Sequence, residues 1–172
     1  MKLVIIYSSN TGNTEKIANT IKATLENKGE IIYFGGPTEN VPQADVYFIG
    51  SWTDKGGATN QIKNTLSKMK NCKIAYFGTA GFKEDEAYYK KIFENISEDI
   101  DATNNILGYF FCQGKMPLGI KARYLKLLEK DKENTEILGQ IENFDNALNH
   151  PNSDDCEKVK KWALEIFEKV ES

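Results

Sequence analysis

Five short apolar runs, separated by segments with helical periodicity, constrain the fold of this chain more than any other feature. The runs lie at residues 3–7, 31–34, 46–50, 74–78 and 106–112, and they are apolar throughout rather than at every second position. Such runs are typical of parallel strands that are covered on both faces. Between them, apolar residues recur at helical spacing, as in Ile17, Ile21 and Leu25. The alternation predicts an α/β fold: a doubly wound, five-stranded parallel sheet between helices, with right-handed crossovers.

The last predicted helix has the clearest apolar stripe, which recurs along one face from Val159 to Val170. Asn152 or Ser153 is expected to cap its start, and the acidic residues that follow favour the positive end of the helix dipole.

Residues 113–152 interrupt the regular alternation. Pro117 is expected to begin a helix that carries Ile120, Tyr124, Leu127 and Leu128, and a charged run and a second short apolar patch follow it. An unstructured loop of this length is unusual inside a compact domain. We therefore expect one domain over residues 1–172 with a helical insertion at about 113–152.

Composition excludes several classes of protein. The chain has 172 residues and a net charge of −3, and a nucleic-acid-binding protein would need a basic face. No stretch approaches the length of apolar sequence that spans a bilayer, and the short N-terminal run does not resemble a signal peptide. We therefore expect a cytoplasmic protein. The three cysteines fit no metal-binding spacing, so we expect reduced thiols and no metal site.

The predicted phosphate site is the segment that joins the first strand to the first helix. Ligands of open parallel sheets bind beyond the carboxyl ends of the strands, where backbone N–H groups and the dipole of the following helix favour an anion. The segment is rich in hydroxyl and amide side chains, includes a glycine that allows a tight turn, and has no Lys or Arg. Its residues are Ser8, Ser9, Asn10, Thr11, Gly12, Asn13 and Thr14.

Three further segments follow strands at the same predicted edge of the sheet. After the third strand come Ser51, Trp52, Thr53, Asp54, Lys55 and Gly56; after the fourth come Gly78, Thr79, Ala80, Gly81 and Phe82; after the fifth come residues 112–115. We expect Cys112, at the end of the fifth strand, to be a buried residue rather than a reactive one.

The pattern Ser9-x-Thr11-Gly12-Asn13-Thr14 after an apolar strand resembles the phosphate loop of flavodoxins. The resemblance covers about residues 1–112 and the last helix. It implies the strand order 2-1-3-4-5 and flavin mononucleotide (FMN) as cofactor. It also implies that the loops after the third and fourth strands flank the flavin ring.

The resemblance gives roles to individual residues near the ring. It implies that Trp52 stacks on one face of the flavin, with simple packing as the alternative. It implies that a peptide at Gly56 or Gly57 meets the flavin N5–H. Phe82 is the nearest aromatic for the second face, and a packing role is an equal alternative. Lys55 lies in one of these loops and Lys83 in the other, where flavodoxins carry acidic residues; a lysine facing the ring would raise its potential.

The insertion after the fifth strand is similar to that of an outlying group of flavodoxin-like proteins from anaerobic bacteria, some of which are associated with reductases of bilirubin. A partner-docking face and a lid over the flavin are both open roles for it.

The leading hypothesis is a monomeric electron carrier that has no catalytic residue of its own. It would pass electrons from a reductase to an acceptor enzyme, and a bilirubin-type reductase is one candidate for the acceptor. The alternative is an FMN-dependent NAD(P)H reductase of quinones or another small molecule. A phosphorylated receiver module is excluded. It needs acidic residues after the first strand, where this chain has Ser8, Ser9 and Asn10, and it needs an aspartate at the end of the third strand, which this chain lacks.

Overall fold

The computed structural model describes residues 1–83 and 85–172, which form a five-stranded parallel sheet in the order β2-β1-β3-β4-β5. The strands are β1 (Lys2–Ser8), β2 (Glu30–Gly35), β3 (Val46–Trp52), β4 (Lys73–Ala80) and β5 (Asn105–Gln113). The predicted fold class and strand order are thus confirmed. The order reverses between β1 and β3, and this switch point is where such sheets bind ligands.

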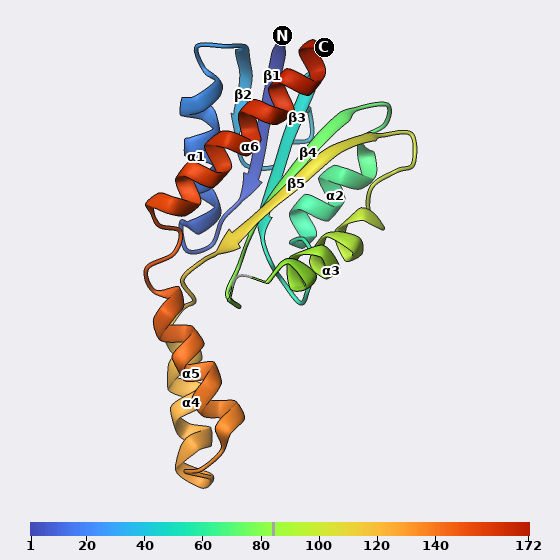
Figure 1. Cartoon of the computed structure of the whole chain (residues 1–172). Coiled ribbons are helices and arrows are strands. Elements are labelled where there is room, and N and C mark those ends of the chain that lie inside the picture. The colour runs from blue at the N-terminus through green and yellow to red at the C-terminus, as the bar shows by residue number, and fades with distance from the viewer. Residues whose placement is uncertain (84) are drawn as a thin grey trace.

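Helices cover both faces of the sheet (Figure 1). On one face lie α1 (Asn13–Leu25) and α6 (Ser153–Glu171); on the other lie α2 (Asn60–Lys68) and α3 (Glu86–Ser97). The inner strands are buried on both sides, and Leu3, Val4, Ile5 and Ile6 are all fully inaccessible to solvent. This double burial explains why the strands are continuous apolar runs.

β3 and β4 extend further than the sequence suggests. In the sheet Trp52 pairs with Thr79, and Ala80 pairs with Gln113 of β5. Ser51, Trp52, Thr79 and Ala80 therefore belong to strands, and their assignment to loops is wrong; Gly78, which the prediction includes both in the fourth run and in the loop after it, belongs to the strand. The ladders on both sides of β4 continue past the apolar runs because backbone pairing does not require apolar side chains.

The start of α6 follows the prediction. Asn152 is its N-cap, and the Asn152 side chain accepts hydrogen bonds from the backbone N–H groups of Asp154 and Asp155. The Asp155 carboxylate accepts one in return from the Asn152 N–H, which completes a capping box.

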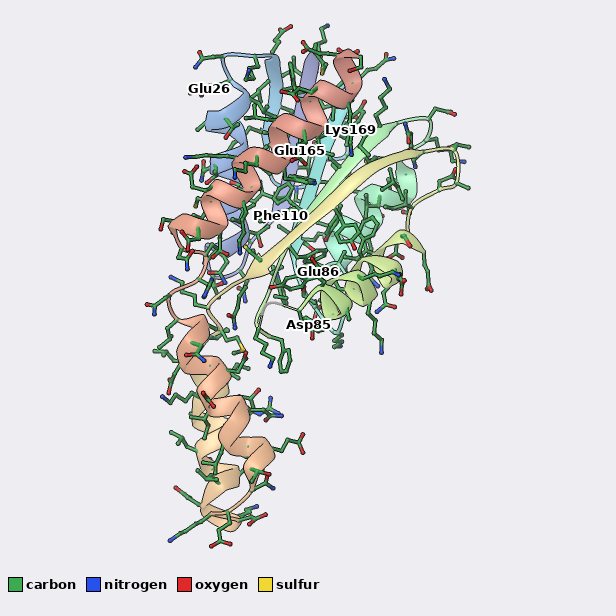
Figure 2. All side chains as sticks on the ribbon, in the orientation of Figure 1. Glu26, Asp85, Glu86, Phe110, Glu165 and Lys169 are labelled. Atoms are coloured by element: carbon green, nitrogen blue, oxygen red, sulfur yellow. The ribbon has the colours of Figure 1, made fainter. Side chains whose placement is uncertain are left out.

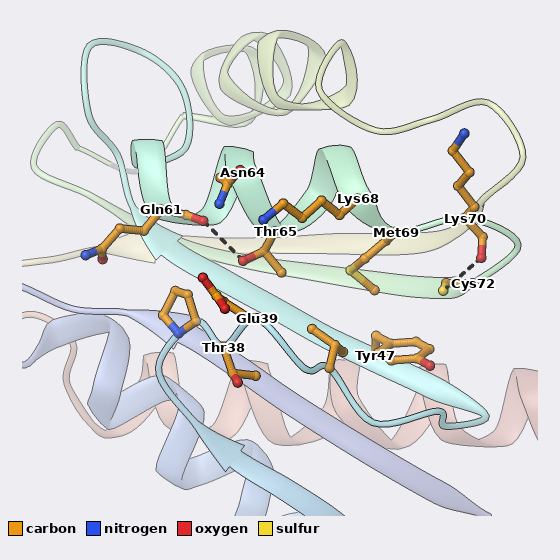
Figure 3. A pocket seen from close by; sticks show the side chains of 12 residues that line it. Thr38, Glu39, Tyr47, Gln61, Asn64, Thr65, Lys68, Met69, Lys70 and Cys72 are labelled. Atoms are coloured by element: carbon orange, nitrogen blue, oxygen red, sulfur yellow. Dashed lines mark hydrogen bonds between the residues drawn. The ribbon is translucent and has the colours of Figure 1, made fainter.

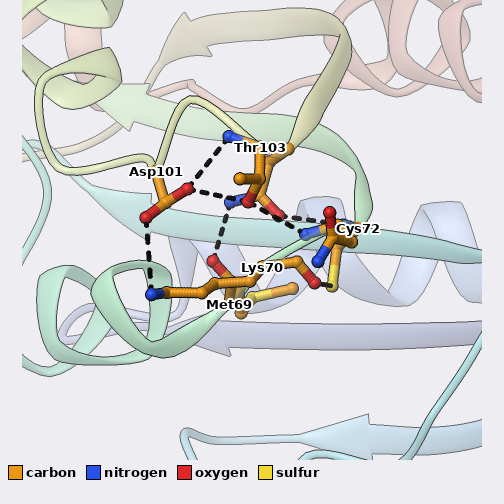
Figure 4. A network of polar contacts seen from close by, with 7 residues as sticks. Met69, Lys70, Cys72, Asp101 and Thr103 are labelled. Carbon is orange, nitrogen blue, oxygen red and sulfur yellow. Dashed lines mark hydrogen bonds and ion pairs between the residues drawn. The ribbon is translucent and has the colours of Figure 1, made fainter.

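Opposite the carboxyl edge of the sheet, the turn before β4 is tied to the turn before β5 (Figure 4). The Asn104 side chain accepts a hydrogen bond from the Cys72 N–H at 2.9 Å and donates one to the Met69 carbonyl at 2.8 Å. The N–H and hydroxyl of Thr103 both donate to the Asp101 carboxylate and lower its pKa. These bonds fix this end of the two strands.

The predicted insertion is a helical hairpin that projects beyond the carboxyl edge of the sheet (Figure 1). It consists of α4 (Leu118–Lys130) and α5 (Thr135–Ala147), which pack along each other. Phe144 and Ala147 of α5 are fully buried, whereas no residue of α4 is. The helical character of the insertion is therefore as predicted, but every residue of α4 is at least partly exposed to solvent.

Candidate functional site

The segment between β1 and α1 presents an open helix N-terminus at the carboxyl edge of the sheet. Gly12, the N-cap of α1, adopts a left-handed conformation with φ 82° and has no side chain of its own to cap the helix. The N-cap side chains of α3, α5 and α6 accept backbone hydrogen bonds, whereas those of α2 and α4 do not. A helix that begins at a glycine behind a polar loop leaves backbone N–H groups and the positive end of a dipole for an anion.

Three side chains of this segment hold it in place rather than extend into free space. Thr14 is fully buried and shares a hydrogen bond of 2.9 Å between its hydroxyl and that of Thr79 in β4. The Asn13 amide donates to the Lys115 carbonyl at 2.8 Å. Ser9 turns toward the helix and accepts from the Glu15 N–H at 3.3 Å. The loop is thus braced against β4 and against the chain that follows β5.

A cavity of about 500 Å³ opens beside this loop, and it brings together half of the residues predicted from sequence. Its size is within the usual range for a small-molecule site. Among its lining residues are Asn10, Thr11, Asn13, Trp52, Thr53, Thr79, Ala80, Gly81, Phe82, Tyr88, Gly114 and Lys115. Ser8 and Ser9 line a smaller adjoining hollow, which Asn10 and Trp52 also border.

The chain after Trp52 turns away from the cavity. Thr53 is fixed to β4 by its N–H and its hydroxyl, both of which donate to the Thr79 carbonyl. A tight turn joins Asp54 to Gly57, with Lys55 at φ 49° and Gly56 at φ 78° in the left-handed region. The Gly56 carbonyl accepts from the Asn95 side chain of α3 at 2.8 Å. Of the predicted set, Asp54, Lys55 and Gly56 lie outside the cavity lining.

Two other predicted residues pack within the sheet. The Ser51 hydroxyl is buried and lies 2.8 Å from the hydroxyl of Tyr76. At Gly78, an added Cβ would lie 2.2 Å from the Phe111 ring of β5. Both residues therefore shape the sheet beneath the cavity.

Aromatic residues border the cavity at the ends of β3 and β4. Trp52 is half-buried. Phe82 is 46% exposed, and its ring meets that of Tyr88 edge-on at 5.4 Å between centroids. Burial raises the pKa of the Tyr88 phenol, which is therefore neutral over the physiological range. A flat apolar ligand would find an aromatic side chain at two sides of this space.

The hairpin supplies a wall of the cavity, from residues that were not individually predicted as site residues. Met116, Ile120 and Tyr124 line the cavity from the start of the hairpin, and Gln140 and Asn143 line it from α5. The Asn143 side chain donates to the Gly81 carbonyl at 2.9 Å, and Gln113 donates to the same oxygen at 3.2 Å. The sequence offered two signals for this wall: the position of residues 112–115 after a strand, and the insertion itself, for which a lid over the flavin was one of two open roles.

Lys115 is the cation that the structure places at the cavity, whereas Lys55 and Lys83 are exposed outside its lining.

Cys112 is fully buried in β5. His150 lies at the start of α6 and pairs its Nδ1 with the Asp155 carboxylate at 2.7 Å.

A second cavity, of about 510 Å³, lies between α2 and the segment after β2 (Figure 3). Its aromatic side chain, Tyr47, is already hydrogen-bonded to the Pro42 carbonyl and the Ala44 N–H. In the described part of the chain, its lining includes no residue from the carboxyl ends of β1, β3, β4 or β5, where ligands of such sheets bind. We therefore assign the site to the first cavity.

Within the described residues, no three His, Cys, Asp or Glu side chains gather in a way that would hold a metal ion. None of the helices in that part of the chain combines the length and apolar character needed to cross a membrane.

Comparisons with known proteins agree with this geometry. The flavodoxin-like domain-containing protein BilS of Clostridioides difficile is 36% identical over 99% of this chain and 98% of its own length. BilS of Clostridium symbiosum is also 36% identical, over 95% of each chain. In three dimensions, oxidised flavodoxin 2 from Bacillus cereus superimposes with a TM-score of 0.61 at 19% identity, covering 98% of this chain and 99% of that one. The family profile described as the flavodoxin domain matches residues 4–164. The chain belongs to the flavodoxin family.

Proposed function

We propose that the cavity binds FMN, with the phosphate at the N-terminus of α1 and the flavin ring between Trp52 and Phe82. The residues present fit this group: a helix N-terminus that begins at a glycine suits a phosphate, and the aromatic side chains at the cavity suit a planar ring. A flavoprotein from Lactobacillus acidophilus, solved in complex with FMN, has the same fold, with a TM-score of 0.50 at 21% identity over 64% of this chain. The observation that carries the proposal is the single cavity that joins the loop before α1 to Trp52 and Phe82.

The protein's own residues bind and orient the cofactor. Thr14 and Asn13 fix the phosphate loop through their bonds to Thr79 and Lys115, so the loop N–H groups are held in position before the ligand arrives. Gly81, held by Gln113 and Asn143, sets the position of the chain at the edge of the ring. FMN, when bound, supplies the redox chemistry.

The role that follows is that of an electron carrier in the cytoplasm between a reductase and an acceptor enzyme. Within the described residues no two cysteines form a disulfide, as expected in a reducing compartment. An enzyme of the bilirubin-reductase type is our choice of acceptor. It rests on the resemblance to flavodoxin-like proteins of anaerobes, and the two BilS proteins align with this chain through the hairpin as well as the sheet.

Rapid mixing with NADH and NADPH separates this role from that of an NAD(P)H reductase. With the flavin-loaded protein alone, we expect the absorbance of the oxidised flavin to persist, because Trp52 and the hairpin wall occupy the approaches a nicotinamide would need. Rapid bleaching by either nucleotide, without a separate reductase, would contradict the carrier role.

Replacing Trp52 by alanine is expected to weaken FMN binding by about tenfold to a hundredfold, since stacking on an aromatic side chain is worth roughly 1–3 kcal/mol. Fluorescence titration of the apoprotein measures the effect. Riboflavin, which lacks the phosphate, should lose affinity to the same extent. Unchanged affinity for both would leave Trp52 with a packing role only.

A further inference from the structure

The hairpin carries a basic helix in an acidic protein. α4 has four basic residues and one acidic residue, although the whole chain has a net charge of −3. Its antiparallel partner α5 has three acidic residues and no basic one. Charge is therefore sorted between the two helices of the hairpin.

Three of the cations of α4 face solvent. Lys121 pairs with Asp145 of α5 and belongs to the contact between the helices. Arg123, Lys126 and Lys130 are exposed, and in the described part of the chain none of them has an ion-pair partner. Their spacing of three and four residues places them in one stripe along the helix. Figure 2 shows side chains extending outward along the whole hairpin.

Large apolar side chains border this stripe. Leu118 is 76% exposed, and Leu125 and Leu127 are each nearly half exposed. Helical geometry places Leu118 and Leu125 on one side of the cations and Leu127 on the other. Exposed apolar side chains bordered by charged ones are typical of a surface that docks a partner.

The stripe lies next to the flavin cavity. Ile120 and Tyr124 of α4 line that cavity, and Arg123 and Leu127 follow them closely around the helix. Lys115, also exposed, lines the cavity from the base of the hairpin. A protein that covers the cavity mouth with an interface of about 800 Å² reaches well onto α4.

We propose that the outward face of α4 docks an acidic, partly apolar surface of the redox partner protein, an inference that rests on the proposed carrier function. The overall negative charge alone would predict a basic partner, and the local charge beside the cavity reverses that expectation. The occupant is a protein because an electron acceptor must approach the cavity mouth. The exposed face of α4 also lacks the Trp and Phe anchors of helices that lie in a membrane surface.

Binding to two standard probe proteins of opposite surface charge tests the proposal. Immobilised cytochrome b5 provides an acidic surface and immobilised cytochrome c a basic one, and interferometry measures binding of the purified full chain to each. We expect binding to cytochrome b5 that weakens as salt is added. The triple variant Arg123→Glu, Lys126→Glu, Lys130→Glu should lose at least about tenfold of that affinity. The corresponding glutamine variant, which removes charge without reversing it, should lose less.

A matched control reverses three exposed lysines at the opposite end of the sheet: Lys28, Lys73 and Lys169, the last labelled in Figure 2. It changes net charge equally and should leave cytochrome b5 binding within about twofold of the unaltered protein. Equal losses in both triple variants, or none in either, would overturn the docking proposal. So would binding to phosphatidylserine vesicles that depends on the three cations of α4. The binding measurement does not require flavin, so it tests the docking proposal independently of the proposed function. Failure of FMN binding would be recognised separately, from a protein that is colourless.

Discussion

Replacing Thr11 by aspartate is expected to weaken FMN binding by about 100- to 1000-fold while the protein stays folded. Thr11 lines the cavity directly before the N-terminus of α1. A carboxylate there would lie close to the phosphate, and two like charges about 4 Å apart repel by roughly 4 kcal/mol in partly screened surroundings. The same carboxylate favours the helix dipole, so the free energy of unfolding of the apoprotein should not fall.

Two controls make this result specific to the phosphate. Riboflavin binding by the Thr11→Asp variant should be nearly unchanged, the opposite of the pattern expected for Trp52→Ala. Thr135→Asp makes the same substitution at an exposed position in the first turn of α5, away from the cavity lining, and should bind FMN normally. Normal FMN affinity in the Thr11 variant would show that the phosphate lies elsewhere.

Replacing Gly78 by alanine is expected to reduce the free energy of unfolding by about 1–3 kcal/mol. The new Cβ would lie 2.2 Å from the Phe111 ring, which packs over Gly78 from the paired position on β5. The ring is buried among the side chains between the sheet and α3, so it has little room to move. Urea denaturation measures the loss.

Gly139→Ala is the matched control. Gly139 lies inside α5, and an added Cβ would meet no atom within 4 Å, so alanine should stabilise the protein by about 0.5–1 kcal/mol. In the Gly78 variant, the second substitution Phe111→Leu should recover part of the loss, because the two residues are in contact. Wild-type stability in Gly78→Ala alone would contradict the packing described here.

The parallel sheet could be predicted because doubly buried strands are continuous apolar runs and the intervals have helical periodicity, whereas the strand order followed from the resemblance to flavodoxins. The position of the phosphate loop followed from the same logic, since Thr11 and Gly12 come directly after a strand and before a helix. The exact ends of β3 and β4 could not be predicted from the sequence, because Thr79 and Ala80 continue the backbone pairing with β5 beyond the apolar run. Gly78 looked like part of a ligand loop, and only the position of the Phe111 ring explains it.

The hairpin illustrates a different limit. The first of its helices was visible in the spacing of Ile120 and Tyr124, but the direction of that helix was not. The contact that joins the hairpin to the cavity links Asn143 to Gly81, which are 62 residues apart in the chain. Single side chains decide such contacts, and local sequence patterns carry no information about them. Leu127, expected on the packed side of its helix, is instead 45% exposed.

The central claim is that the open N-terminus of α1 and the cavity beside it bind FMN. The most direct measurement is the flavin content of the purified protein, obtained from its visible spectrum and from the flavin released on denaturation. The account predicts a yellow protein that releases one FMN for each chain, or an apoprotein that takes up added FMN to that stoichiometry. A colourless protein that does not take up added FMN would contradict it.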